Sequence, residues 1–192
     1  MPSSLTTESF PARQRLSIRR ASGVLRAGRL IVHTTATVPG VAAVPQAGAV
    51  HALCRFKQRQ GPFLMLAASA KEALSWARFR NHTLRTMMQQ SWPGPVTLVY
   101  PGRPGLPGAC YQRGRIAVRV DADAHCRSLA SQCGGLLLSS SFNRRGMPVA
   151  APERLSRLRF DGAIQGVYAW GQGSGQASAI YALSPRGAKK LR

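Results

Sequence analysis

The chain has 192 residues, and its 44% hydrophobic content is enough for one well-formed core. Lys and Arg total 27 against 6 Asp and Glu, a formal net charge of +21. No apolar run approaches the roughly 18 residues of a membrane span. These features predict a protein without a transmembrane helix and with a polyanionic partner such as a nucleotide or nucleic acid. Codon bias in a GC-rich genome is an alternative source of the arginines, and both explanations stay open at this point.

The acidic residues and the cysteines restrict the chemistry that the chain can support. No two carboxylates stand in a context typical of a general acid and base, and six are too few for a protein cage around Mg²⁺ or Ca²⁺. Any such ion is therefore expected to arrive on a phosphate ligand, and no metal site is predicted. The cysteines lack C-x-x-C spacing, which favours free thiols in a cytosolic protein. The acidic residues are Glu8, Glu72, Asp121, Asp123, Glu153 and Asp161, and the cysteines are Cys54, Cys110, Cys126 and Cys133.

The first third of the chain predicts two helices around one strand. Residues 1–12 are polar and interrupted by proline, which is typical of a flexible tail. Apolar residues recur at helical spacing over 18–28 and again over 47–57, and the second helix runs into Lys57-Gln58-Arg59. The short strand 30–32 lies between them and is followed by the hydroxyl-rich stretch 33–37.

The middle of the chain alternates strands with helices. Ser69 and Asn81 are typical N-caps, and Asp121 is expected to cap a third helix. Arg119 stands in an otherwise apolar strand, and an arginine in that position usually has a specific acceptor. Strands are expected at 63–68, 96–101 and 116–120.

The stretch 136–148 is the most suggestive part of the sequence. Three leucines predict a buried strand, and a run of serines, an asparagine and two arginines follows them. Open α/β sheets bind ligands where strands end in such donors, although a strand entering an ordinary polar turn has the same composition. Beyond it, a helix is expected at 152–160 and strands at 166–170 and 178–183. The glycine-rich segment 171–176 lacks a following helix and a GK[ST] pattern, so it is not predicted to be a P-loop.

This succession of elements predicts a single domain of the α/β (α+β) class, built on one twisted mixed β-sheet flanked by helices. The domain is expected to span residues 13–185. The flexible tail 1–12 precedes it, and residues 186–192 are expected to form a basic C-terminal tail.

Five short pieces, in this order along the chain, together resemble the YrdC/TsaC family. They are KQR at 57–59, SWPGPVTLVYP at 91–101, IAVRV at 116–120, SSSFN at 139–143 and S-x-I at 178–180. The resemblance covers roughly residues 15–185 and implies a YrdC-like fold. It also implies a nucleotidyltransferase that makes threonylcarbamoyl-adenylate from L-threonine, bicarbonate and ATP and releases pyrophosphate. The product of that family feeds the threonylcarbamoyl modification of the tRNA adenosine next to the anticodon.

The resemblance assigns roles to individual residues and implies ligands and partners. ATP is expected as a substrate that carries its own Mg²⁺, and the partners are expected to be tRNA or double-stranded RNA and downstream threonylcarbamoyl-transferase proteins, in the cytoplasm and without a membrane. No residue is assigned as a catalytic nucleophile, acid or base. The residues implied to bind ATP and its phosphates are Lys57, Arg59, Arg119, Ser139, Ser141 and Asn143, and those implied to bind threonine are Thr35, Thr97 and Ser178.

The sequence departs from the family pattern at three places. Ala36 stands where the family motif Y-P-T-E has its glutamate, the loop at 60–62 is shortened, and Phe142 replaces an alanine, where it could crowd the pocket. Two hypotheses follow. The chain is either a divergent working synthase or a non-catalytic paralogue that keeps the fold and binds tRNA or double-stranded RNA.

Overall fold

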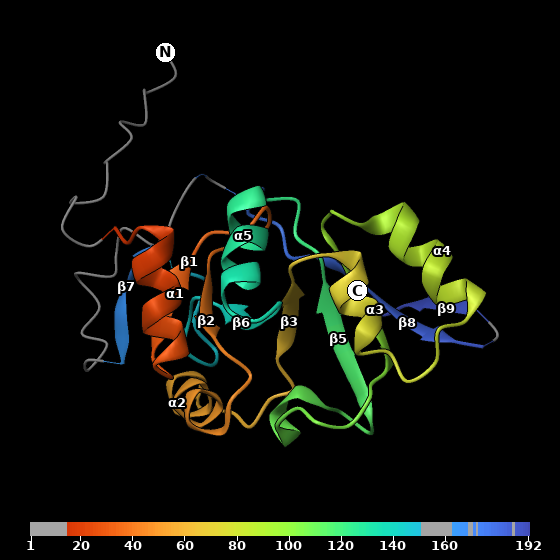
Figure 1. Cartoon of the computed structure of the whole chain (residues 1–192), viewed down its shortest axis with the longest axis horizontal. Coiled ribbons are helices and arrows are strands. Elements are labelled where there is room, and N and C mark those ends of the chain that lie inside the picture. Colours follow the sequence, from red (N-terminus) through yellow and green to blue (C-terminus); the bar gives the residue numbers. More distant parts are fainter. Residues whose placement is uncertain (1–14, 151–162, 169–170, 172, 186) are drawn as a thin grey trace, which may run out of the picture.

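The computed structural model describes residues 15–150, 163–168, 171, 173–185 and 187–192. In these residues the chain builds one mixed sheet of nine strands, in the spatial order β7-β1-β2-β6-β3-β5-β4-β8-β9 (Figure 1). This confirms the predicted α/β domain on a mixed sheet flanked by helices. The strands are β1 (Leu30–His33), β2 (Gly40–Ala43), β3 (Leu64–Ala67), β4 (Val96–Pro101), β5 (Arg115–Arg119), β6 (Leu136–Ser141), β7 (Ile164–Tyr168), β8 (Ala179–Ser184) and β9 (Gly187–Lys190).

The sheet is mixed because three of its strand pairs are parallel and the others antiparallel. The parallel pairs are β1 with β7, β3 with β5 and β4 with β8. Strand β6 pairs antiparallel with β2 on one side and with β3 on the other, so Ser139 lies opposite both Ala42 and Leu64. The leucines of β6 are buried in the core, as expected for a strand covered on both sides.

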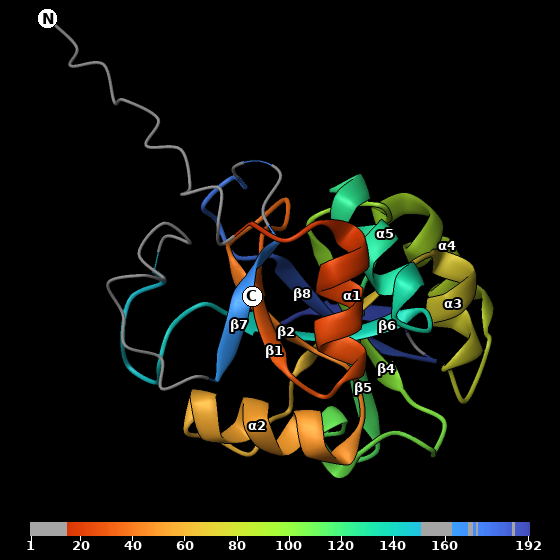
Figure 2. The same ribbon diagram turned by 60° about the vertical axis from the view of Figure 1, so that its left-hand side comes forward.

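The described residues contain five α-helices: α1 (Ile18–Arg26), α2 (Ala47–Lys57), α3 (Ala70–Ser75), α4 (His82–Ser91) and α5 (Ala124–Gln132). Helices α1, α5, α3 and α4 follow one another over one face of the sheet, whereas α2 lies apart from them, across the lower end of the sheet as drawn (Figures 1 and 2). A short 3₁₀ helix, η1 (Gly108–Cys110), lies between β4 and β5. None of the helices in the described part of the chain has the length and hydropathy needed to cross a membrane.

Four of the five helices in the described residues begin at a side-chain cap, and α2, which follows Gln46, begins without one. Ser69 accepts a hydrogen bond from the Glu72 amide, and Asn81 accepts one from the Leu84 amide, as predicted. The prediction for Asp121 is wrong, because Asp123 caps α5 through the amide of His125. Asp121 is used elsewhere, as described below.

Three further differences from the predictions concern strands. Strand β2 was not predicted, and it forms because its apolar residues fit between β1 and β6. The serines at 139–141 belong to β6 itself rather than to a turn after it. The sheet also extends beyond the domain boundary expected at residue 185, since Gly187–Lys190 pairs with β8 as β9. The helix predicted at 152–160 and the tail at 1–12 lie outside the described residues.

The cysteines are free thiols. Cys54, Cys110 and Cys126 are buried, and burial raises the pKa of Cys110 to about 11. A thiol with such a pKa is protonated at neutral pH and is a weak nucleophile. The cysteines therefore act as small core residues.

Candidate functional site

Lys57 is the last residue of α2 and lies at the centre of the first polar cluster. Only 4% of this lysine is exposed, and its ammonium group donates to the backbone oxygens of Ser141 and Asn143 and to the side-chain oxygen of Asn143, at 2.5 Å in the last case. The Ser141 hydroxyl donates to the same Asn143 oxygen at 2.7 Å. The end of helix α2 and the end of strand β6 therefore meet at one amino group.

Burial and the neighbouring positive charge of Arg59 lower the pKa of Lys57 to about 8. Three oxygens accept from its nitrogen, which matches the three protons of an ammonium ion. At neutral pH the cluster thus holds a positive charge that is shielded from water.

Arg59 adds a second positive charge two residues after Lys57. Its guanidinium donates to the backbone oxygen of Pro62 at 2.9 Å, reaches the Ser140 hydroxyl at 3.4 Å, and stacks over the ring of Phe63 at 4.6 Å. The shortened loop at 60–62 is thereby fixed against the arginine side chain.

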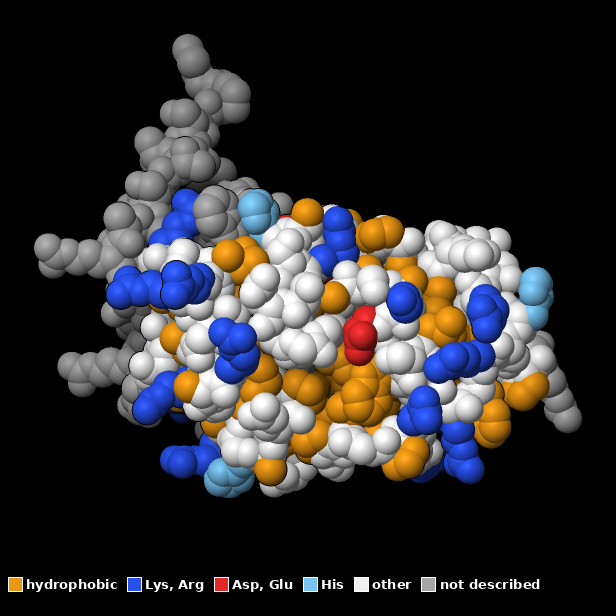
Figure 3. All heavy atoms as spheres, viewed as in Figure 1, with side chains coloured by type: hydrophobic (Ala, Val, Ile, Leu, Met, Phe, Trp, Pro, Cys, Tyr) orange, Lys and Arg blue, Asp and Glu red, His pale blue; other side chains and the backbone are white. Residues whose placement is uncertain are grey.

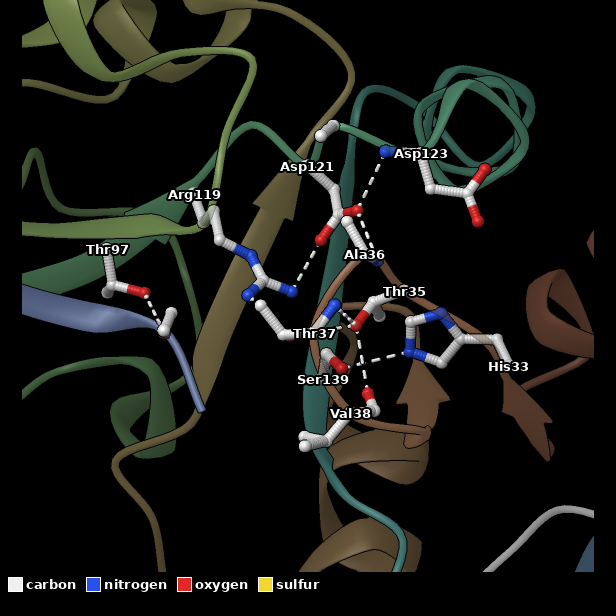
Figure 4. A network of polar contacts seen from close by, with 12 residues as sticks. His33, Thr35, Ala36, Thr37, Val38, Thr97, Arg119, Asp121, Asp123 and Ser139 are labelled. Atoms are coloured by element: carbon white, nitrogen blue, oxygen red, sulfur yellow. Dashed lines mark hydrogen bonds and ion pairs between the residues drawn. The ribbon is translucent and has the colours of Figure 1, made fainter. Parts of the chain in front are cut away.

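The second cluster joins the β1–β2 loop to the end of β5 (Figure 4). Arg119 is 2% exposed and forms an ion pair with Asp121 at 2.5 Å, and it donates to the Thr37 hydroxyl at 2.8 Å. Asp121 accepts from the Ala36 amide at 2.9 Å. The sequence prediction that Arg119 has a specific acceptor is confirmed.

The donor and acceptor roles of the Thr35 hydroxyl follow from its three contacts. Its hydroxyl donates to the Val38 carbonyl, so it must accept from the Thr37 hydroxyl as well as from the Thr37 amide. Thr37 in turn accepts from Arg119. The Thr35 hydroxyl thus shapes the loop, and all of its hydrogen-bonding positions are used within the protein.

His33 and Ser139 form a buried neutral pair beside this loop (Figure 4). The His33 Nε2 atom lies 2.9 Å from the Ser139 hydroxyl. Burial lowers the pKa of His33 to about 4, against the opposing effect of Asp121. The imidazole is therefore uncharged at neutral pH. A side chain at Gly40 would collide with this pair, since its Cβ would lie 2.7 Å from the Ser139 hydroxyl.

A second polar pair joins strand β4 to the residue directly before strand β8. The hydroxyls of Thr97 and Ser178 lie 2.9 Å apart, and both residues are buried. Arg192 donates twice to the Ser178 carbonyl, at 3.0 and 3.2 Å. Arg192 therefore holds the backbone of Ser178, a residue that the family resemblance assigned to threonine binding.

The glycine-rich segment closes on the β1–β2 loop from the other side. The Ser174 amide donates to the Ala36 carbonyl at 3.0 Å, and the Gly175 amide donates to the Thr37 carbonyl at 2.9 Å. A Cβ at Gly173 would collide with the carbonyl oxygens of Thr35 and Thr37. The glycine-rich segment, which was not predicted to be a P-loop, thus packs closely against the β1–β2 loop.

Comparison with known proteins decides the family. The family model Sua5/YciO/YrdC, described as telomere recombination, matches residues 23–192. The chain belongs to the Sua5/YciO/YrdC family. A threonylcarbamoyl-AMP synthase of Alkalilimnicola ehrlichii is 34% identical over 159 residues, which is 81% of this chain and 81% of that protein. The threonylcarbamoyl-AMP synthase of Methylococcus capsulatus is 33% identical over 147 residues, 73% of this chain and 78% of its own length.

Solved structures of the Sua5/YciO/YrdC family share the fold. Sua5 of P. abyssi, complexed with L-threonine, matches with a TM-score of 0.83 and 25% identity over 91% of this chain. This chain covers 53% of that Sua5 chain, so it spans about half its length. E. coli YciO matches with a TM-score of 0.77 at 20% identity, over 91% of this chain and 87% of its own, and that likeness concerns the fold alone.

The structure arranges the residues predicted from the Sua5/YciO/YrdC resemblance in separate groups. Lys57, Ser141 and Asn143 contact one another. Arg119, expected with the phosphate-binding residues, is instead connected through Thr37 to Thr35. Their roles toward substrates stay predictions. Phe142 is fully buried and stacks on Phe56, with ring centroids 6.5 Å apart.

Sequence reasoning missed two residues that organise this family site, Thr37 and Asp121. Thr37 looked like one more hydroxyl in a polar loop, and Asp121 looked like a helix cap. The available signal was that Arg119 needed an acceptor and Asp121 stands two residues after it. In the described residues, no cluster of three or more His, Cys, Asp or Glu side chains is arranged to hold a metal ion.

Proposed function

We propose that the protein is a threonylcarbamoyl-AMP synthase, a nucleotidyltransferase that uses L-threonine, bicarbonate and ATP. The threonine amine and bicarbonate form a carbamate with loss of water. A carbamate oxygen then attacks the α-phosphorus of ATP, and pyrophosphate leaves. The reaction needs no covalent nucleophile on the protein, since it depends on neutralising phosphate charge and aligning the reactants.

The observation that carries this proposal is the convergence of Lys57, Ser141 and Asn143. Lys57 is a buried residue, and its ammonium group is held by three oxygens, so it is already positioned before a ligand arrives. Phosphate oxygens are stronger partners for it than neutral carbonyls. On ATP binding, Lys57 would exchange part of this contact set for phosphate oxygens, with Arg59 beside it. Divalent metal would come with ATP, and the chain's few carboxylates suit that arrangement.

Pyrophosphate release tests the proposal directly. The purified protein is expected to release pyrophosphate from ATP only when L-threonine and bicarbonate are both present. Lys57→Ala and Asn143→Ala are expected to lower this rate by roughly a hundredfold or more, in the range of losing a transition-state contact. Lys71→Ala removes the same charge from an exposed position on α3 and is expected to match the wild type. An absence of threonine-dependent release in the wild-type protein would refute the proposal.

RNA binding without catalysis is the second candidate, and the charge of +21 favours it. Lys and Arg side chains are spread over the face seen in Figure 3, with little acidic surface between them. The loss of the family glutamate at Ala36 also favours it. A protein of this kind would bind tRNA or double-stranded RNA without using ATP. Under the first proposal, the same surface would bring tRNA and a downstream transferase protein to a cytoplasmic enzyme.

A further inference from the structure

Asp121 is a buried carboxylate in a protein that has few acidic residues. It is 1% exposed, and in the described part of the chain no other Asp or Glu is buried. A buried charge is costly unless it is paired and hydrogen-bonded. Its position therefore requires a compensating structure, and the contacts around it supply one.

The contacts of Asp121 close a ring. One carboxylate oxygen accepts from the amides of Ala36 and Asp123, both at 2.9 Å, and the other pairs with Arg119 at 2.5 Å. Arg119 donates to Thr37 at 2.8 Å, and Thr37 follows Ala36 directly. The ring thus fixes the β1–β2 loop to the end of β5, across 85 positions of sequence at its Ala36 contact.

The ring leaves one strong donor unused. The Arg119 Nε atom is buried and has no hydrogen-bond partner among the described residues. The two terminal nitrogens of the guanidinium point at Asp121 and Thr37 (Figure 4). A buried donor without a partner is costly, and a ligand is one way to satisfy it.

The ring also contains Ala36, one of the three places where the sequence departs from the pattern that the family resemblance implies. That resemblance implies a glutamate at position 36, and the Asp121 carboxylate accepts a hydrogen bond from the backbone amide of Ala36 at 2.9 Å. A negative charge is therefore present beside position 36, supplied by the segment that follows β5.

We propose that Asp121 is a positioning residue that supplies the carboxylate missing at position 36. It holds Arg119 and the Thr35–Thr37 loop in the arrangement that receives the amino-acid substrate. The inference rests on the proposed function, to which it adds a positioning residue. In the described residues no hydrogen bond or ion pair links the ring to the Lys57 cluster, so loss of the ring is expected to affect the use of threonine rather than of ATP.

The test compares two aspartates that stand two residues apart. Asp121→Asn keeps the shape but removes the charge that pairs with Arg119. Asp123→Asn makes the same charge change at the side chain that caps α5, where asparagine is an equally good cap, and it keeps the backbone amide that donates to Asp121. The Michaelis constants for L-threonine and for ATP are measured by pyrophosphate release, with thermal unfolding recorded for each variant.

Asp121→Asn is expected to raise the KM for threonine at least about tenfold, with little change in the KM for ATP. Asp123→Asn is expected to match the wild type. Adding Ala36→Glu to Asp121→Asn returns a carboxylate to the ring and is expected to lower the threonine KM again. A merely structural role would not give this selective loss and rescue.

The outcomes separate the two levels of inference. If the wild-type protein releases no pyrophosphate, the proposed function fails. If it is active and Asp121→Asn behaves like Asp123→Asn, or weakens both substrates equally, the positioning role is overturned. A failure of Ala36→Glu to rescue would overturn the replacement of the missing carboxylate. Should Asp121→Asn not fold, Thr37→Val breaks the same ring by removing one hydroxyl, and an unchanged threonine KM there would overturn the proposal.

Discussion

Phe142 shows how a single departure from a family motif can be absorbed by the core. The side chain is fully buried and stacks on Phe56, at an angle of 10° between the rings. Phe142→Ala is expected to destabilise the protein by about 3–5 kcal/mol, because it removes apolar contact and leaves a cavity. Urea unfolding measures the change. Phe79→Ala removes the same group from a position that is 61% exposed, and it is expected to cost well under about 1 kcal/mol. Similar losses at the two sites would contradict the burial of Phe142.

Lys57 gives nucleotide binding a pH dependence of known sign. Its pKa is about 8 instead of the ordinary 10.5, so the charge that we propose meets phosphate is lost as the pH rises through about 8. The affinity for Mg²⁺–ATP is expected to fall about tenfold between about pH 7 and about pH 9. The free energy of unfolding changes in the opposite direction and rises with pH. Between pH 8 and 10.5 the Lys57 amine keeps its proton in the unfolded chain but loses it in the folded protein, so the cost of burying the charge disappears as the pH rises.

Isothermal titration at the two pH values checks the affinity. Lys57→Arg is the matched control, because arginine stays charged throughout this range. Whatever its affinity at about pH 7, the affinity of that variant should not change by pH 9. An equal loss in both proteins would assign the pH effect to another group.

At the scale of elements, the glycine-rich segment 171–176 and the β1–β2 loop depend on close backbone contact. Gly173→Ala would place a Cβ 2.5 Å from the Thr35 carbonyl oxygen and closer still to that of Thr37. Backbone atoms cannot rotate away, so the loops must separate. We expect a destabilisation of about 1–3 kcal/mol and a raised KM for threonine. Thermal unfolding and pyrophosphate release measure the two effects.

Gly23→Ala is the control for this substitution. Gly23 lies within α1, and a Cβ there meets nothing within 4 Å. Alanine favours a helix over glycine by about 0.5–1 kcal/mol, so this variant should be slightly more stable than the wild type. Two glycine-to-alanine changes of opposite sign would separate steric contact from backbone entropy. An unharmed Gly173→Ala protein would show that the two loops do not touch in solution.

The elements that the sequence predicted well are those that local chemistry decides. Helix α2 begins and ends at the predicted residues, Ala47 and Lys57, because its apolar spacing is regular. Asp121 and Asp123 satisfy the same local rule for a helix cap, and only a contact with Ala36 in a distant loop distinguishes them. Strand β2 was missed for a similar reason, since its pairing with β1 and β6 forms it. The residues of the Lys57 cluster were predicted from the family resemblance. The hydrogen bonds among them could not be predicted, because the spacing of residues along the sequence does not show which side chains meet.

At the scale of the whole molecule, the charge of +21 makes RNA binding a quantitative question. Counterion release makes the logarithm of the affinity fall linearly with the logarithm of salt. A surface that contacts several tRNA phosphates should lose roughly a thousandfold or more in affinity between about 50 and about 200 mM salt. Fluorescence anisotropy with labelled tRNA measures the slope, and heparin of similar length serves as a polyanion without RNA structure.

The comparison of the two polyanions decides what the charge is for. If tRNA binds more tightly than heparin at every salt concentration, the surface recognises RNA geometry as well as charge. Equal affinities would mean that the arginines act as bulk charge, in agreement with codon bias. Saturating Mg²⁺–ATP should leave tRNA binding unchanged if the nucleotide occupies the Lys57 cluster, because that lysine is buried and cannot belong to the RNA surface. Competition between ATP and tRNA would instead place both ligands on the same positive surface.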